Sequence, residues 1–144
     1  MKVTTVIDRD IDERVEIYAR NRTPLVEQIE ELVSGYGVSI TGYSQGEITP
    51  LSPDAIIRVY VENNKMYAST EGGTYQLKLR LYQLEETLGA SFIKINQSSL
   101  VNKAHIKKFS SSWGGSMTVE MSNGESDYIS RRQTKTVLER MGIK

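Results

Sequence analysis

The sequence contains no cysteine and one histidine, His105, so it lacks most of the side chains that bind zinc in proteins. The missing cysteines exclude disulfide bonds, and they suit a reducing compartment. A metal site would need carboxylates alone, and no acidic cluster has the spacing of known ligand loops. We therefore expect no metal and no cofactor, and a structural or surface position for His105.

Long apolar runs are also missing. No stretch approaches the roughly 18 apolar residues of a membrane helix, and residues 1–12 are too polar for a signal peptide. The phosphate-loop, dinucleotide-binding and serine-nucleophile motifs of common enzymes do not occur either. The sequence thus predicts a cytoplasmic protein without enzymatic activity.

Neither sign of charge is in excess, since 18 basic residues balance 18 acidic ones. Their distribution along the 144 residues is uneven. Residues 1–55 hold 5 basic and 10 acidic residues, whereas residues 56–144 hold 13 basic and 8 acidic residues. The resulting net charges of −5 and +5 indicate an acidic part and a part that attracts anions.

The acidic part contains one clear helix. Thr23 suits the N-cap and Pro24 the first helical position, and Gly35 or Gly37 would end the helix. Its apolar residues recur at helical spacing: Leu25, Val26, Ile29, Leu32 and Val33. This stripe fits either packing on a sheet or a dimer contact through Leu25, Ile29 and Leu32.

The segments around this helix give weaker patterns. Met1–Ile7 predicts a short strand, and Val15–Ala19 fits either a strand or a helical turn. Ser39–Leu51 is polar and predicts a connector. We place the domain boundary after it, so that residues 1–53 form a strand–helix segment for dimerisation or input and residues 54–144 form a second domain.

Apolar and polar residues alternate in short runs from Arg58 onward, which is typical of β-strands. The expected strands are Arg58–Glu62, Met66–Thr70, Thr74–Lys78, Phe92–Ile95, Ile106–Phe109, Met117–Met121 and Tyr128–Ser130. Turns are expected at Asn63-Asn64, Gly72-Gly73 and Asn123-Gly124, and a loop at Trp113-Gly114-Gly115. Two short helices are expected, one with Leu81, Leu84 and Leu88 before Gly89, and one from Ser130 to Met141. The fold class is therefore α+β and mostly β, with small antiparallel sheets.

Two arginines open the last predicted helix. With Ser130 as N-cap, Arg131 and Arg132 lie in the first turn, where the helix dipole is positive and a cation costs about 0.3–1 kcal/mol. Two guanidinium groups and free helix N–H groups suit a phosphate, and an arginine can also contact guanine in the major groove. The alternative is that one arginine pairs with Glu125 or Asp127.

Polar side chains also follow the strand Phe92–Ile95. The run Asn96-Gln97-Ser98-Ser99, together with Asn102, offers amides and hydroxyls for base edges and phosphates, and Gln97 could contact adenine. An ordinary capped turn would explain the same run. Asn63-Asn64-Lys65 would place an amide and an ammonium at the DNA surface, or form a plain hairpin turn. More positive charge for phosphates comes from Lys103, Lys107 and Lys108.

Three spaced segments together resemble the LytTR family of DNA-binding domains. They are Leu79–Glu85, then Phe92–Asn102 with His105-Ile106, and then the Asn123-Gly124 hairpin that leads to Tyr128–Arg132. The resemblance covers residues 54–144. It implies an elongated, mostly β fold whose loops enter successive major grooves of double-stranded DNA and bend it.

The resemblance also implies contact positions and partners. It places Gln97 and Arg132 at contact positions, and it places Asn64 or Lys65 in the first contacting loop, with Lys65 the better candidate. Such regulators bind paired direct repeats as homodimers. By analogy with stand-alone members of the family, a small membrane protein would control activity.

We therefore hypothesise a bacterial transcription regulator that binds double-stranded DNA sequence-specifically. Its affinity should fall with salt, and good base contacts should contribute about 1–3 kcal/mol each. The alternative is a protein-interaction module whose basic face binds an acidic or membrane-bound regulatory partner without DNA contact. The predicted contact residues are Asn64, Lys65, Asn96, Gln97, Ser98, Ser99, Asn102, Lys103, Lys107, Lys108, Arg131 and Arg132.

Overall fold

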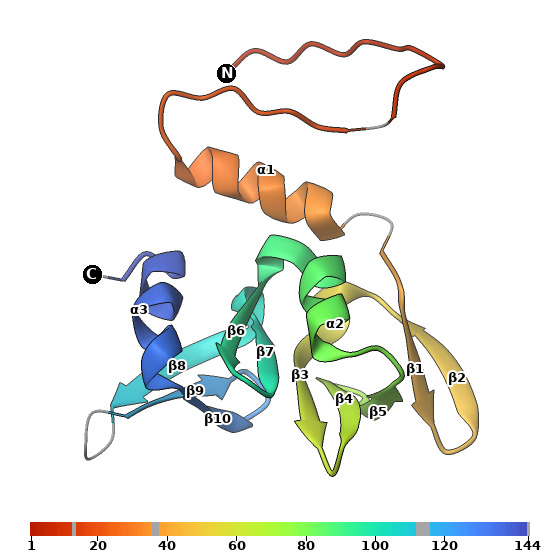
Figure 1. The fold of residues 1–144 in the computed structure, drawn as a ribbon, viewed down its shortest axis with the longest axis vertical. Helices are drawn as coiled ribbons and strands as arrows, with labels where there is room; N and C mark the ends of the chain where they lie inside the picture. Colours follow the sequence, from red (N-terminus) through yellow and green to blue (C-terminus); the bar gives the residue numbers. More distant parts are fainter. Residues whose placement is uncertain (13, 36–37, 112–115, 144) are drawn as a thin grey trace.

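Two antiparallel sheets form the centre of the computed structural model, which describes residues 1–143 except 13, 36–37 and 112–115 (Figure 1). The larger sheet has the order β2 (Glu47–Leu51), β1 (Ile40–Ser44), β5 (Gly73–Leu77), β4 (Lys65–Thr70), β3 (Ile56–Glu62), β7 (Ser99–Asn102), β6 (Phe92–Asn96). The smaller sheet has the order β10 (Ser126–Ile129), β9 (Met117–Met121), β8 (Ile106–Ser111). The predicted mostly β fold of antiparallel sheets is confirmed.

Three helices complete the described part of the chain, and all three were expected. They are α1 (Pro24–Gly35), α2 (Leu81–Leu88) and α3 (Arg131–Arg140). Thr23 caps α1 as predicted, since its Oγ1 accepts from the Val26 N–H at 3.3 Å. Gly89 follows α2 with φ +69°, a conformation that glycine adopts at low cost.

The hairpin of β3 and β4 is closed by the predicted two-residue turn. Asn63 and Asn64 both have positive φ, at 52° and 62°, and the strands pair at Glu62 and Lys65. Two positive φ values define the tight turn whose twist matches that of antiparallel strands, and asparagine tolerates them better than most residues. The turn therefore projects Asn64 and Lys65 from the end of the sheet.

Three expectations about the N-terminal part are wrong, one of them being Val15–Ala19, which forms neither a strand nor a helical turn. Met1–Ile7 forms no strand, because its apolar side chains are exposed and no described strand pairs with it. Ser39–Leu51 is a β-hairpin instead of a connector, and β1 continues the larger sheet at Tyr43 beside Gln76 of β5. The alternation of apolar and polar residues expected for a strand was hard to see in β1, because one of its inward-facing positions is Gly42. The division at residue 53 stays a prediction, and the Trp113-Gly114-Gly115 loop lies outside the described residues.

Strands β6 and β7 separate two hydrophobic cores. One core lies between the larger sheet and α2 and contains Ile40, Leu51, Ile56, Val59, Met66, Ala68, Leu77, Leu84, Leu88, Phe92 and Leu100. The other lies against the smaller sheet and α3 and contains Ile57, Ile93, Ile95, Val101, Val119, Met121, Ile129 and Val137. Successive strand residues point to opposite faces, so Leu100 and Val101 serve different cores.

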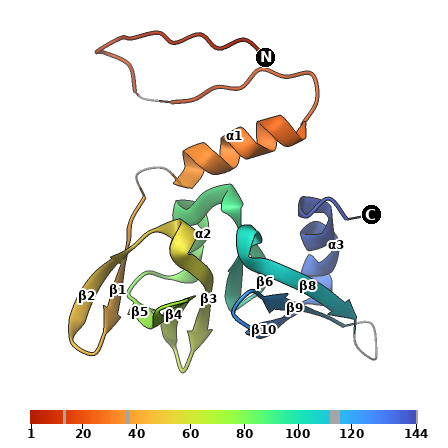
Figure 2. The ribbon, with the colours of Figure 1, turned by 180° about the vertical axis from the view of Figure 1, so that it is seen from behind.

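The two ends of the molecule carry different elements. The N-terminal segment and α1 lie at one end, with α1 against the 3₁₀ turn η2 (Gly89–Ser91) (Figures 1 and 2). The β3–β4 and β6–β7 turns and the start of α3 lie toward the opposite end. The acidic segment and the predicted contact loops are therefore separated by the body of the sheets.

The β1–β2 hairpin gives a stability test. A Cβ at Gly42 would lie 2.8 Å from Leu51 Cδ1 and 2.9 Å from Tyr75 Cβ, which is closer than packed atoms approach. We expect Gly42→Ala to lower the free energy of unfolding by about 1–3 kcal/mol in urea titrations. The exposed neighbour Thr41 provides the control Thr41→Ala. Equal stability of the two variants would contradict the packing of this hairpin on β5.

Candidate nucleic-acid interface

The exposed part of the β6–β7 turn consists of Gln97 and Ser98. The Val61 N–H donates to the Ser98 carbonyl at 2.9 Å, so this turn lies beside the end of β3. The Ser130 N–H donates to the Ile95 carbonyl at 2.9 Å, so the start of α3 lies on its other side. Three segments from distant parts of the sequence thus meet: the β3–β4 turn, the β6–β7 turn and the N-terminus of α3.

A carboxylate that is largely shielded from water holds these segments in place. Asp127 accepts hydrogen bonds from Ser99 Oγ at 2.6 Å, from Asn96 Nδ2 at 3.3 Å and from Arg58 Nη1 at 3.1 Å. Arg58 also pairs with Glu125. The Arg58 and Asp127 side chains are 14% and 16% exposed, so the pair is largely removed from water. This network joins β3, β6, β7 and β10.

Asn96 and Ser99 were predicted to contact DNA, and the structure places both inside this network. Asn96 is 1% exposed, and its Nδ2 also donates to the Tyr128 carbonyl at 2.8 Å while its Oδ1 accepts from the Ser98 N–H at 2.8 Å. Ser99 is 3% exposed. Contact with DNA would require them to break these bonds, so their geometry favours a role in holding the turn.

Arg131 and Arg132 lie where the sequence analysis expected them. Both are exposed in the first turn of α3, whose N-cap is Ser130. The two acids considered as their partners, Glu125 and Asp127, are bound to Arg58. The two guanidinium groups lie at the positive end of the helix dipole, an arrangement that favours an anion.

Asn64 and Lys65 are exposed at the β3–β4 turn. Just behind the turn, the rings of Tyr60 and Tyr67 stack with centroids 5.7 Å apart, and the Arg58 guanidinium lies 4.0 Å from the Tyr60 centroid. Burial raises the pKa of Tyr60 above its ordinary value, although the Arg58 charge opposes this. These contacts stiffen the base of the hairpin that presents the turn.

The remaining predicted residues lie away from this group. Asn102 is buried, and its Nδ2 donates to the carbonyls of Pro53 and Ile56 at 3.3 and 2.9 Å. Lys107 and Lys108 are exposed on β8, where Lys107 Nζ lies 3.6 Å from Glu120. His105 bridges the Asp54 carbonyl at 2.8 Å and Ser122 Oγ at 3.2 Å, which makes it a structural link.

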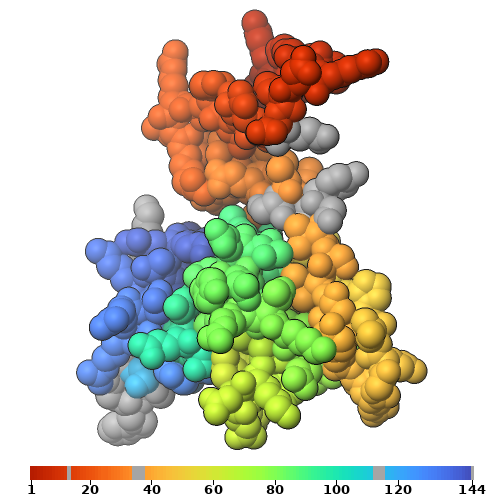
Figure 3. All heavy atoms as spheres, turned by 45° about the vertical axis from the view of Figure 1, so that its right-hand side comes forward, coloured from red at the N-terminus to blue at the C-terminus, as the bar shows by residue number. Residues whose placement is uncertain are grey.

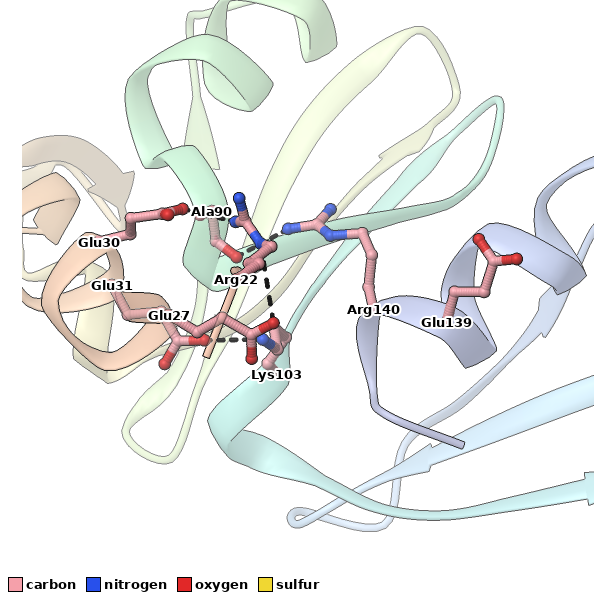
Figure 4. A pocket seen from close by; sticks show the side chains of 8 residues that line it. All are labelled: Arg22, Glu27, Glu30, Glu31, Ala90, Lys103, Glu139 and Arg140. Carbon is pink, nitrogen blue, oxygen red and sulfur yellow. Dashed lines mark hydrogen bonds and ion pairs between the residues drawn. The ribbon is translucent and has the colours of Figure 1, made fainter. Parts of the chain in front are cut away.

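Lys103 belongs to a charged hollow between α1 and α3 (Figure 4). Its Nζ lies 2.6 Å from Glu31 of α1, and Arg22 pairs with Glu30 at 2.6 Å. Arg140 donates to the carbonyls of Ala90 and Phe92 at 2.8 and 3.2 Å, and burial lowers its pKa from the ordinary value. The lysine therefore anchors α1 at the end of the molecule away from the turns.

Arg58 is the central residue that the sequence analysis missed. In the sequence it is one polar position in an alternating strand, 67 residues from Glu125 and 69 from Asp127. The signal that could have found it is a pair of acids two positions apart, Glu125 just before β10 and Asp127 within it, since alternate residues of an extended chain face the same way. Nothing in the sequence indicates which cation they meet.

Comparison with known proteins identifies the fold and the family. The family model of the LytTr DNA-binding domain matches residues 46–142. The chain belongs to this family. A LytTr DNA-binding domain from Bacillus cereus has the same fold, with a TM-score of 0.69 and 24% identity over 73% of this chain and 97% of that one.

Relatives extend the similarity beyond the LytTR domain. Proteins of Staphylococcus aureus strains MSSA476 and MW2, each called an uncharacterized HTH-type transcriptional regulator, are 32% identical over 146 residues. The alignment covers 99% of this chain and 99% of each relative. The family and these names indicate a DNA-binding transcription regulator. Within the described residues, no helix combines the length and apolar content needed to cross a membrane.

The Asp127 network leads to a second prediction. Asp127→Ala leaves the largely buried Arg58 with one carboxylate instead of two and removes the acceptor of Ser99, so we expect a loss of roughly 3 kcal/mol in the free energy of unfolding. Glu120→Gln is the control, because its partner Lys107 is 64% exposed and such pairs contribute less than about 1 kcal/mol. Equal losses in urea titrations would contradict a central role for Asp127.

Proposed function

We propose that this LytTR protein is a cytoplasmic regulator that binds double-stranded DNA sequence-specifically through loops. The observation that carries the proposal is the meeting of three exposed polar segments at one end of the molecule: Asn64-Lys65, Gln97-Ser98 and Arg131-Arg132. Amide, hydroxyl and guanidinium groups are those that contact base edges and phosphates. Gln97 and Arg132 are the candidates for base contacts, and Lys65 and Arg131 for phosphates.

Loop insertion fits this chain better than a helix-turn-helix. That motif needs two helices joined by a short turn. In the described chain, β1 to β5 separate α1 from α2, and β6 to β10 separate α2 from α3. Turns at the end of a rigid sheet can enter a major groove about 12 Å wide, and the start of α3 can approach beside them. The HTH-type name of the S. aureus relatives therefore does not describe the geometry proposed for this protein.

Fewer residues are available to contact DNA than the residue types alone suggested. Asn96, Ser99 and Asn102 are buried and bonded within the domain, and Lys103 is paired with α1. We assign the first two to positioning Gln97 and Ser98. Lys107 and Lys108 lie on β8 as secondary phosphate contacts.

The function is tested by mobility shifts on the DNA upstream of the gene, with excess competitor DNA. Arg132→Ala should weaken specific binding about 10- to 100-fold, because one good base contact contributes about 1–3 kcal/mol. Arg20→Ala removes the same charge from an exposed position in the N-terminal segment and should bind like the wild type. Binding at salt concentrations from 50 to 200 mM should fall steeply.

Two outcomes would contradict the proposal. A folded Arg132→Ala protein with full affinity and specificity would remove α3 from the interface. A wild-type protein that gives no shift at low salt would favour the module that binds an acidic or membrane-bound partner.

We further propose that α1 mediates a homodimer that places two domains on direct repeats. Leu25 and Leu32 are 47% and 73% exposed, and Ile29 is half-buried. The acids of α1 are engaged within the chain, with Glu27 and Glu30 at Arg22 and Glu31 at Lys103. The stripe is thus apolar and uncharged, so the stripes of two copies can pack together without charge repulsion. Residues 1–35 are also where we place input from a regulatory partner.

The dimer is tested by sedimentation equilibrium. Leu25→Ser/Leu32→Ser should raise the dissociation constant of the dimer at least about tenfold, because each leucine loses apolar burial in both copies. Ile48→Ser is the control, since Ile48 is 69% exposed on β2. Unchanged association in the double variant would place the dimer contact elsewhere.

A further inference from the structure

A groove beside the β3–β4 turn contains basic residues that the sequence analysis did not single out. It is lined by the ends of β3, β4 and β5, by the loop after β5 and by the start of α2. Figure 3 shows the yellow-green β3–β4 turn below the green segment that contains this loop and α2. The polar residues of the groove are Asn64, Lys65, Gln76, Lys78, Arg80 and Tyr82.

The basic residues of this groove take no part in the ion pairs of the described chain. Lys65, Lys78 and Arg80 line it, and no acid is among its lining residues. In the described residues, none of the ion pairs involves these three cations, whereas Arg22, Arg58 and Lys103 all pair with carboxylates. Three positive charges around one hollow create a local potential that attracts an anion.

The arrangement of these cations is set by the sheet. Met66 of β4 pairs with Leu77 of β5, so Lys78 follows directly beside Lys65. The Lys78 ammonium lies 4.3 Å from the centroid of the Tyr43 ring, a cation–π contact that holds its position. Arg80 is the N-cap of α2, where the helix dipole is positive, so the local structure gives this charge no compensation.

The groove continues the row of proposed DNA contacts. Along the same edge of the larger sheet come the end of β5, the β3–β4 turn and the β6–β7 turn. Four steps of about 4.8 Å separate β6 from β5, which makes this row about 19 Å wide. The major groove is only about 12 Å wide. When these turns lie across the major groove with Gln97 at the base edges, the end of β5 therefore lies over the phosphate backbone.

We propose that Lys78 and Arg80, with Lys65, bind the phosphodiester backbone beside the major groove that the loops enter. The inference rests on the proposed function and adds a second contact site to it. Ammonium and guanidinium groups donate to phosphate oxygens without reading the base sequence. The groove therefore raises affinity for every DNA sequence equally and fixes how the loops are aligned in the major groove.

The test is the salt dependence of binding by Lys78→Gln/Arg80→Gln, measured on the specific fragment and on a scrambled one. Each lost phosphate contact lowers the slope of log K against log salt by about 0.9, so we expect the slope to fall by about 2. Affinity should fall by the same factor on both fragments, and a hydroxyl-radical footprint should lose protection at one edge. The control Lys2→Gln/Arg9→Gln removes the same charge from exposed N-terminal positions. It should leave the slope, the affinity and the footprint unchanged.

The outcomes separate the two proposals. An unchanged slope and footprint in the double variant, with specific binding by the wild type, would overturn the phosphate site and leave the proposed function intact. A loss of discrimination at constant slope would also overturn it, because the groove would then contact bases. Absence of wild-type binding would overturn both. If circular dichroism shows that the double variant is unfolded, the single variant Lys78→Gln replaces it in the test. Its slope of log K against log salt should fall by about 1.

Discussion

The arrangement of the proposed interface depends on the carboxylate of Asp127. Its two oxygens receive hydrogen bonds from Arg58 of β3, Ser99 of β7 and Asn96 of β6, while Asp127 itself belongs to β10 of the other sheet. Each of these strands ends near an exposed turn or at the start of α3. Charge-assisted bonds in a site with little water are stronger and more directional than surface ion pairs. One acidic side chain thus sets the relative positions of segments that are far apart in the sequence.

Cations are used differently at the two ends of the molecule. At the end that carries α1, Arg22 and Lys103 pair with glutamates, and Arg140 donates to carbonyls of the domain. At the opposite end, Arg132, Lys65 and Lys78 are in no described ion pair, and Arg80 and Arg132 are at helix starts where the dipole is unfavourable. A zero net charge therefore does not argue against binding a polyanion, because the attraction depends on where the charges lie.

In residues 56–141 the sequence predicted the helices, the turns and the strands other than β7 well, because their apolar periodicity and turn residues are local signals. Strand β7 was missed, because Ser99–Asn102 was interpreted as part of a polar contact run. The Asn63-Asn64 turn and the glycine after α2 were found from chemistry within a few residues. The β1–β2 hairpin was missed because Gly42 packs without a side chain, so the expected alternation was not visible. For the site, the residue types of Gln97 and Arg132 correctly indicated polar groups suited to DNA. The sequence did not show which of the candidate residues are exposed. Asn96 and Asn102 have the same chemistry as Gln97 and differ only in burial, which depends on partners distant in the sequence: Asp127 for Asn96, and the Pro53 and Ile56 carbonyls for Asn102.

The backbone of the β3–β4 turn restricts how this family member can acquire a new DNA target. Asn63 and Asn64 both occupy the left-handed region, where only glycine, asparagine and aspartate are well tolerated. Few substitutions at these two positions keep the hairpin intact. Gln97 has no such constraint, since its φ is not positive and its side chain is exposed. Among the proposed contact segments, divergence in operator preference should therefore concentrate at the β6–β7 turn and at the start of α3, while the β3–β4 turn changes slowly.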